Sequence, residues 1–103
     1  MIEVRYDGEF CLSVTGHSGQ AEKGSDIVCA GASALAAALA EQLLRNGYWY
    51  RESKIQMGEG EAHIEVRPKS KYYFSCAAAY ETAMCGYELL ANKYSSYIRI
   101  IPM

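Results

Sequence analysis

Residues 2–15 read IEVRYDGEFCLSVT and decide the fold. Apolar residues alternate with charged or polar ones on both sides of Asp7-Gly8, and this alternation is typical of strands with one buried face. Asp-Gly between two alternating runs indicates a hairpin, because both turn residues tolerate a positive φ. We therefore predict two antiparallel strands, at about 2–6 and 9–15, joined by a tight turn.

The rest of the chain predicts two long helices, a second hairpin and a final strand. Ser25 and Asp26 stand where an N-cap belongs, and the run after them, as far as Gly47, is rich in alanine and leucine, which favour helix. A second helix is indicated by apolar residues spaced by threes and fours. The expected elements are a helix after Asp26, strands at 48–57 and 62–67 around Gly58-Glu59-Gly60, a helix at about 71–93 and a strand at 97–101.

These elements predict an α+β fold in the order ββαββαβ. Because hairpins are present, the sheet is expected to be mostly antiparallel or mixed, with two long helices packed on it. The chain has 103 residues, which is the size of one domain, so residues 1–103 are predicted to form a single domain.

The net charge and the distribution of apolar residues indicate which partners and which cellular compartment the protein has. The formal net charge is −2, from 10 basic and 12 acidic residues, which argues against direct contacts with nucleic acid phosphates. The N-terminus carries charge where a secretory signal needs an apolar stretch. The apolar run from Ile27 to Ala40 is shorter than the roughly 20 residues of a membrane span. We therefore expect a soluble cytoplasmic protein with no membrane partner, in which the four cysteines are reduced thiols.

Four cysteines and two histidines raise the question of a metal site. The chain has no Cys-x-x-Cys or His-x-x-x-His spacing, so a zinc site is not expected. Cys76 shares an apolar helical stripe with Tyr80 and is predicted to be a small core residue. His63 is predicted to be a solvated surface residue, and no role follows for Cys11 or Cys85.

Cys29 differs from the other cysteines by its place near the start of the first predicted helix. There, unpaired backbone N–H groups and the positive end of the helix dipole are expected to lower the pKa of its thiol. A thiolate nucleophile also needs a proton acceptor, and His17 is the natural candidate. Residues 16–25, which contain Gly16, Gly19 and Gly24, are expected to form a flexible loop that can bring the imidazole to the sulfur.

Asp26 and Ser33 each allow two interpretations. Asp26 lies three residues before Cys29, so it either orients His17 as the third member of a triad or caps the helix. Ser33 lies one helical turn after Cys29 and either donates a hydrogen bond into the site or packs as a small hydroxyl inside the helix layer. From the residues alone, a cysteine nucleophile and a set of structural thiols both stay open.

Three sequence elements carry a resemblance to a known family: Thr15-Gly16-His17, residues 24–30 reading GSDIVCA, and Ser33. Together they resemble the signature of the bacterial ribosomal-processing cysteine proteases, the Prp family. The resemblance implies a homodimeric α+β enzyme without metal or organic cofactor, with Cys29 as nucleophile and His17 as general base. It places Asp26 and Ser33 at motif positions associated with the active site.

The same resemblance implies a substrate. Family members remove a short N-terminal extension from the twenty-seventh protein of the large ribosomal subunit, cleaving after an aromatic residue. The loop at 16–25 would then rearrange to admit the peptide. This chain departs from the family pattern at Gly31, which costs about 1 kcal/mol relative to alanine in a helix and is expected to enlarge the groove beside Cys29.

Three alternatives remain from the sequence. The chain could be a peptide-binding regulator of the same fold without catalysis, or a protease for another protein such as a phage structural component. A redox sensor that uses Cys29 with a second thiol is the third possibility.

Overall fold

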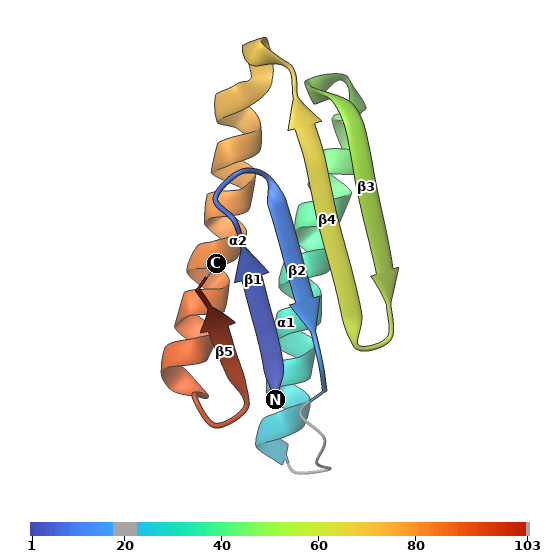
Figure 1. The fold of residues 1–103 in the computed structure, drawn as a ribbon. Helices are drawn as coiled ribbons and strands as arrows, with labels where there is room; N and C mark the ends of the chain where they lie inside the picture. Colours follow the sequence, from blue (N-terminus) through green and yellow to red (C-terminus); the bar gives the residue numbers. More distant parts are fainter. Residues whose placement is uncertain (18–22, 103) are drawn as a thin grey trace.

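The computed structural model describes residues 1–17 and 23–102, with residues 23–26 described by their backbone alone. Its elements follow the predicted order ββαββαβ (Figure 1), so the expected α+β class is confirmed. Short 3-10 turns, Gly47–Trp49 and Ser70–Tyr72, precede the third strand and the second helix. The elements are β1 (Ile2–Tyr6), β2 (Cys11–Thr15), α1 (Lys23–Arg45), β3 (Tyr50–Gly58), β4 (Glu61–Pro68), α2 (Tyr73–Lys93) and β5 (Ile98–Ile101).

The five strands form one mixed sheet in the order β3-β4-β2-β1-β5. Strand β1 runs parallel to β5 and antiparallel to β2, while β2 and β3 are each antiparallel to β4. Because β4 inserts next to β2, the two hairpins join into one sheet. The turn between β3 and β4 therefore lies at the same end of the sheet as the segment that leaves β2, since Thr15 is opposite Glu61.

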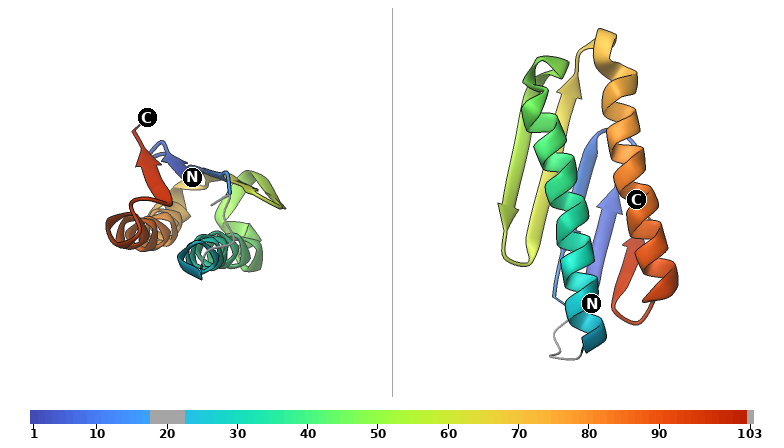
Figure 2. Two further views of the ribbon diagram at one scale, coloured as in Figure 1. Left: turned by 90° about the horizontal axis from the view of Figure 1, so that it is seen from below. Right: turned by 180° about the vertical axis from the view of Figure 1, so that it is seen from behind.

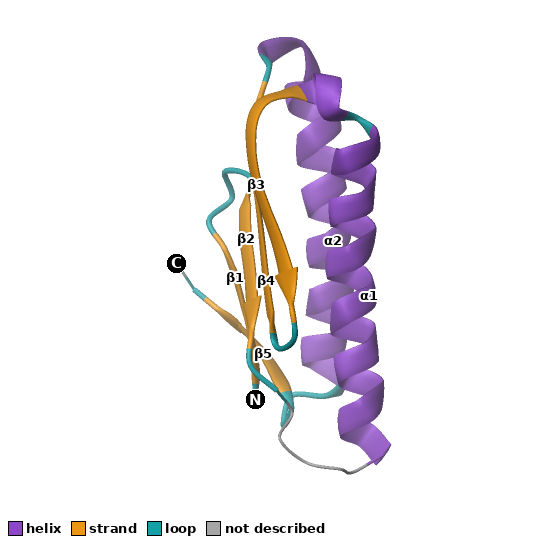
Figure 3. Cartoon of the chain, turned by 90° about the vertical axis from the view of Figure 1, so that its right-hand side faces the viewer, coloured by secondary structure: helices purple, strands orange, loops and turns teal. Residues whose placement is uncertain are grey.

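Both helices cover the same face of the sheet, so the fold has two layers (Figures 2 and 3). Strands β1, β2 and β4 bury alternate residues against the helices. In β2, Leu12 and Val14 are buried, whereas Cys11 and Ser13 point to the outer face. Cys76 is fully buried in α2, as the sequence predicted. The helices add these buried side chains: Val28, Ala32, Ala36, Leu39, Ala40 and Leu43 from α1, and Cys76, Ala79, Tyr80, Ala83 and Tyr87 from α2.

Glycines let the two helices approach each other closely. A Cβ added at Gly31 would lie 3.3 Å from Leu90 Cδ1, and one added at Gly86 would lie 2.5 Å from Leu35 Cδ2. Gly31 therefore faces α2. The expectation that it enlarges the groove beside Cys29 is wrong, because its missing side chain makes room for Leu90.

Helix α1 begins earlier than the sequence predicted. It starts at Lys23, so Ser25 and Asp26 are its third and fourth residues and neither is the N-cap. Gly24, expected in the flexible loop, belongs to the helix, while Gly19 lies outside the described residues. The prediction failed because serine and aspartate are favourable in a first helical turn as well as at the N-cap.

One described helical segment, Ile27–Arg45, is long and apolar enough by length and composition to cross a membrane. This segment extends five residues beyond the stretch from Ile27 to Ala40 on which the sequence argument relied. The core helix of a globular protein meets the same criterion, and this segment packs Val28, Leu39 and Leu43 into the core. The expectation that the protein has no membrane partner stays a prediction.

The turn between β1 and β2 is longer than predicted. It spans residues 7–10, and both Gly8 and Phe10 adopt positive φ values, of 78° and 70°. The Asp7 carboxylate accepts hydrogen bonds from the backbone N–H groups of Glu9 (2.7 Å) and Cys11 (3.2 Å). These bonds stabilise the wider turn, so β2 starts two residues later than the alternation indicated.

Charged side chains connect the outer faces of β1 and β5. Arg99 donates two hydrogen bonds to the Glu3 carboxylate, and Arg5 donates another. The hydrogen bond from Arg99 is the main reason that the pKa of Glu3 lies below its ordinary value. Since a lowered pKa in the folded state stabilises the protein above the unfolded-state pKa, this contribution is present at neutral pH. It is lost as the pH falls through the folded-state pKa.

Candidate active site

A groove of about 400 Å³ brings together residues from three parts of the fold. It lies where the segment after β2, the first half of α1 and the β3–β4 turn meet. His17 and Cys29 both line it, as does Ser33. The structure therefore places three of the four predicted site residues at one groove, while the side chain of Asp26 lies outside the described residues. The groove is further lined by Ile2, Val14, Gly16, Ala32, Ala36, Ala37, Met57, Gly58, Glu59, Gly60 and Glu61.

Backbone contacts at the end of β2 hold His17 in place. Its carbonyl accepts a 2.7 Å hydrogen bond from the N-terminal ammonium of Met1. The preceding residue, Gly16, donates its N–H to the carbonyl of Gly60 (3.0 Å). The first contact continues the pairing of β1 with β2, in which Glu3 lies opposite Thr15, and the second continues the pairing of β2 with β4, in which Thr15 lies opposite Glu61.

The imidazole of His17 packs directly against the backbone of Gly60. A Cβ added at Gly60 would lie only 2.3 Å from Nε2 of His17. Gly60 also has a φ of +72°, a conformation that side-chain-bearing residues rarely adopt. The turn glycine is therefore required twice, once for its own backbone conformation and once to leave room for the histidine ring.

Cys29 reaches the groove from α1, where it is half-buried and packs against the core. It is the seventh residue of the helix, so it lies beyond the first turn. The expectation that unpaired N–H groups of the first turn surround its sulfur is wrong, since those groups belong to residues nearer Lys23. Ser33 follows one turn later and lines the same groove, which confirms that the two side chains share a face.

The lining of the groove has an acidic part and a small apolar part. Glu59 and Glu61 bring two carboxylates from the β3–β4 turn. Ala32, Ala36 and Ala37 are small, and they form an apolar part of the lining along α1. The described lining therefore combines two carboxylates with a row of small apolar side chains.

Replacing Gly60 with alanine is expected to displace the imidazole of His17. A shift of about 1 Å at a reacting group can cost roughly 100-fold in rate, so we expect a loss of peptidase activity of that order. The matched control is Gly8→Ala, because Gly8 also has a positive φ, of +78°, but a Cβ there meets nothing within 4 Å. It should lose stability by about 1–2 kcal/mol while keeping full activity. Equal activity loss in both variants would contradict a specific role of the Gly60 contact.

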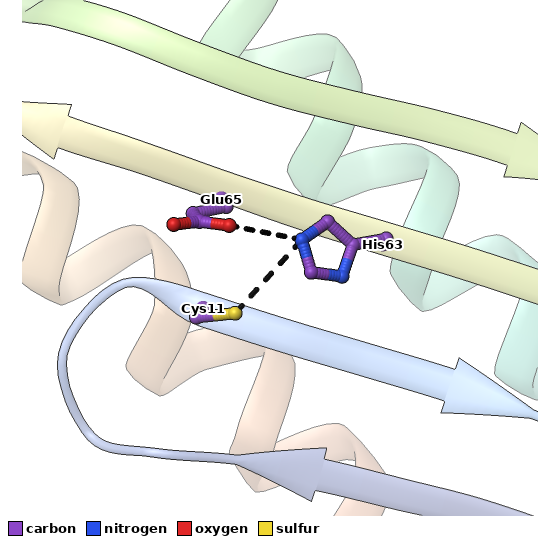
Figure 4. A group of neighbouring side chains, drawn as sticks. All are labelled: Cys11, His63 and Glu65. Atoms are coloured by element: carbon purple, nitrogen blue, oxygen red, sulfur yellow. Dashed lines mark hydrogen bonds and ion pairs between the residues drawn. The ribbon is translucent and has the colours of Figure 1, made fainter.

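A second cysteine–histidine pair lies on the outer face of the sheet (Figure 4). Sγ of Cys11 is 4.0 Å from Nε2 of His63, and the same nitrogen is 3.0 Å from Oε1 of Glu65. The prediction that His63 is simply solvated is wrong, because its side chain is half-buried and has three polar neighbours, the third being Ser13. The sequence could not show this pair, since 52 positions separate Cys11 from His63.

Neighbouring groups shift the pKa values of Cys11 and Glu65. Burial, followed by the charge of Glu65, raises the pKa of the Cys11 thiol. The hydrogen bond from His63 lowers the pKa of the Glu65 carboxyl. Elsewhere, burial raises the pKa of Cys76, and Cys85 is exposed on α2.

A thiol and an imidazole that line one groove supply the nucleophile and the base that a cysteine peptidase needs. A family model described as cysteine protease Prp matches residues 1–99. The chain therefore belongs to the Prp family of cysteine proteases. A search of the curated proteins found no match.

Solved structures share the fold of this chain. The S. aureus ribosomal processing protease Prp, in complex with a substrate peptide, is 24% identical with a TM-score of 0.77 and 100% of both chains covered. Its complex with a covalently linked product peptide gives 25% identity, a TM-score of 0.76 and the same coverage. SMU.848 from Streptococcus mutans is 24% identical with a TM-score of 0.78, covering 100% of this chain and 94% of that chain.

Proposed function

We propose that this protease removes a short N-terminal extension from a precursor of a large-subunit ribosomal protein. The observation that carries the proposal is the presence of His17 and Cys29 at one groove. The description of the S. aureus relative as a ribosomal processing protease that takes a peptide substrate supports the substrate class. We place the reaction in the cytoplasm, where ribosomal proteins are made.

In the proposed mechanism, His17 takes the proton of the Cys29 thiol as the sulfur attacks the scissile carbonyl. The oxyanion of the tetrahedral intermediate requires hydrogen-bond donors in the groove. His17 then gives its proton to the amine of the leaving fragment, and an acyl-enzyme remains on the sulfur. Water, deprotonated by His17, hydrolyses this thioester and restores the thiol. The reaction needs no metal or organic cofactor.

The groove lining supports an extended, basic peptide substrate. Glu59 and Glu61 favour positively charged residues, which are abundant in ribosomal proteins because these bind RNA. The small side chains of Ala32, Ala36 and Ala37 leave room for a large apolar side chain beside Cys29. This fits cleavage after an aromatic residue.

The proposal is tested by incubating the full chain with a peptide that copies the N-terminal region of such a precursor. Intact mass should show release of the N-terminal fragment. Binding of the peptide without cleavage would favour the alternative of a non-catalytic regulator. Iodoacetamide labelling gives a second measurement, since selective fast labelling of Cys29 below neutral pH supports a nucleophile and uniform slow labelling of all four thiols does not.

We further propose that the protease is a homodimer. An apolar groove between the outer faces of α1 and α2 supports this, because Ile27 and Leu89 are 54% and 71% exposed there. Replacing Leu89 with glutamate is expected to shift the protein from dimer to monomer in sedimentation equilibrium. Leu44→Glu is the matched control, since Leu44 is 59% exposed but does not line the groove. A monomeric wild type would contradict the proposal.

A further inference from the structure

Four polar side chains from two neighbouring strands meet on the outer face of the sheet. In this outer cluster, Cys11 and Ser13 come from β2, while His63 and Glu65 come from β4. The thiol sulfur, the imidazole Nε2 and a carboxylate oxygen of Glu65 all lie within 4.8 Å of one another. Figure 4 shows the cysteine, the histidine and the glutamate converging on one point above the strands.

The strand register explains this convergence. Cys11 lies opposite Glu65, and Ser13 lies opposite His63. Residues two apart on a strand point to the same face, and directly opposed residues have Cβ atoms about 4.5–5.5 Å apart. The four side chains therefore occupy the corners of a rectangle. The pairing of β2 with β4 holds them together without any contribution from a loop.

A hydrogen bond orients the histidine. Nδ1 of His63 lies 3.1 Å from Oγ of Ser13, while Nε2 faces the sulfur and the carboxylate. With an ion bound, Nδ1 would carry the proton and donate it to Ser13, and Nε2, which donates to Glu65 in the absence of the ion, would present its lone pair to the metal. Histidines that bind metals commonly donate their second ring N–H in this way, which fixes the tautomer and the ring orientation.

We propose that Cys11, His63 and Glu65 bind a divalent transition-metal ion of the zinc class, with Ser13 as a positioning residue. Thiolate, imidazole and carboxylate are the three ligand types that zinc accepts, and a water molecule would complete the tetrahedron. On binding, the Cys11 thiol releases its proton to solvent. The two anionic ligands then balance the charge of the ion.

The distances fit such an ion after small side-chain movements. Tetrahedral zinc bonds of about 2.0–2.3 Å place neighbouring ligand atoms roughly 3.3–3.6 Å apart. The cluster has 4.0 Å between Sγ and Nε2 and 3.0 Å between Nε2 and Oε1. An ion between the three atoms would draw the sulfur closer and separate the nitrogen from the oxygen.

The geometry distinguishes this site from a second catalytic centre. In a nucleophile–base–acid chain, the nucleophile and the acid contact different nitrogens of the imidazole. Here Cys11 and Glu65 both approach Nε2. A thiolate ligand also disfavours Mg²⁺ and Ca²⁺, which prefer oxygen. The cluster lies on the outer face of the sheet, whereas the groove with Cys29 is on the side that faces the helices.

Cobalt(II) is the probe that tests the proposal, because a cobalt–thiolate bond gives a charge-transfer band in the near-ultraviolet. We expect the reduced full chain to bind one equivalent of Co²⁺ at neutral pH with this band, and Zn²⁺ to displace it. Cys11→Ser should lose the band. Cys85→Ser is the matched control and should keep it, since Cys85 is exposed on α2.

Affinities for Zn²⁺ measured by competition give a second readout. Ser13→Ala should keep the cobalt band but weaken zinc binding by about 10- to 100-fold. Ser13→Thr keeps a hydroxyl at this position and should bind zinc with the affinity of the wild type. Glu65→Gln should weaken binding by at least about 10-fold, and this variant keeps the test valid if Cys11→Ser fails to fold. Far-ultraviolet circular dichroism checks the fold of each variant.

Four results would overturn the proposal. The first is a wild type without the charge-transfer band, and the second is a folded Cys11→Ser variant that retains it. The third is loss of the band in Cys29→Ala, because the metal would then lie in the active-site groove. The fourth is unchanged zinc affinity in Glu65→Gln.

Discussion

Replacing Cys29 with alanine should abolish cleavage of a ribosomal-protein precursor peptide, with a loss on the order of 10³-fold or more. The variant keeps the groove but removes the only thiol among its described lining residues. His17→Ala should lose activity to a similar extent, because the thiol then lacks its proton acceptor. Both are measured from the initial rate of fragment release, followed by intact mass.

The double variant separates a joint mechanism from two independent effects. Residues that act as one catalytic unit have non-additive effects, so Cys29→Ala combined with His17→Ala should be no slower than either single variant. Cys85→Ala is the matched control and should cleave like the wild type, because Cys85 lies on α2 and does not line the groove. Wild-type rates in Cys29→Ala would refute the assignment of the nucleophile.

Replacing Tyr80 with alanine should lower the free energy of unfolding by about 3–5 kcal/mol. The ring is fully buried, stacks on Tyr6 at 5.4 Å between centroids and meets the edge of Phe10. Its hydroxyl lies 2.9 Å from the carbonyl of Phe10 and 2.8 Å from that of Ile64. Burial raises the pKa of Tyr80 far above the usual range, so the hydroxyl stays a donor at every working pH.

Comparing Tyr80→Phe with Tyr80→Ala separates the contribution of the hydroxyl's hydrogen bonds from that of the packed ring. Tyr80→Phe keeps the ring and removes the hydroxyl, so we expect a cost of about 1 kcal/mol. Urea unfolding measures both variants. Phe74→Ala is the matched aromatic control, since Phe74 is 83% exposed, and it should change stability by less than about 0.5 kcal/mol. An equal cost for Tyr80→Phe and Tyr80→Ala would show that packing of the ring contributes little.

The predictable parts of the fold are those set by local patterns. Alternation around Asp7-Gly8 and around Gly58-Glu59-Gly60 places both hairpins, and the spacing of apolar residues places both helices. The helix start at Lys23 was not predictable, because capping residues also occur inside first turns. The wider first turn depends on the hydrogen bonds that Asp7 accepts, which the alternation does not reveal.

The two cysteine–histidine pairs differ in how far the sequence could reveal them. His17 and Cys29 are close in sequence and flank the start of one helix, so local reasoning brings them together. Cys11 and His63 meet only because β4 pairs with β2 in one register. A shift of that register by one residue would turn His63 to the other face of the sheet. Cross-strand clusters therefore require the topology before they can be recognised.

The parallel pairing of β1 with β5 also affects how the chain folds during synthesis. Glu3 and Arg99, which pair across these strands, are 96 positions apart. Contacts of such long range slow folding, since a large loop must close before they form. Until the ribosome has released the last strand, one edge of β1 presents unpaired N–H and C=O groups to other nascent chains. Docking of β5 therefore ends the interval in which that edge is open to aggregation.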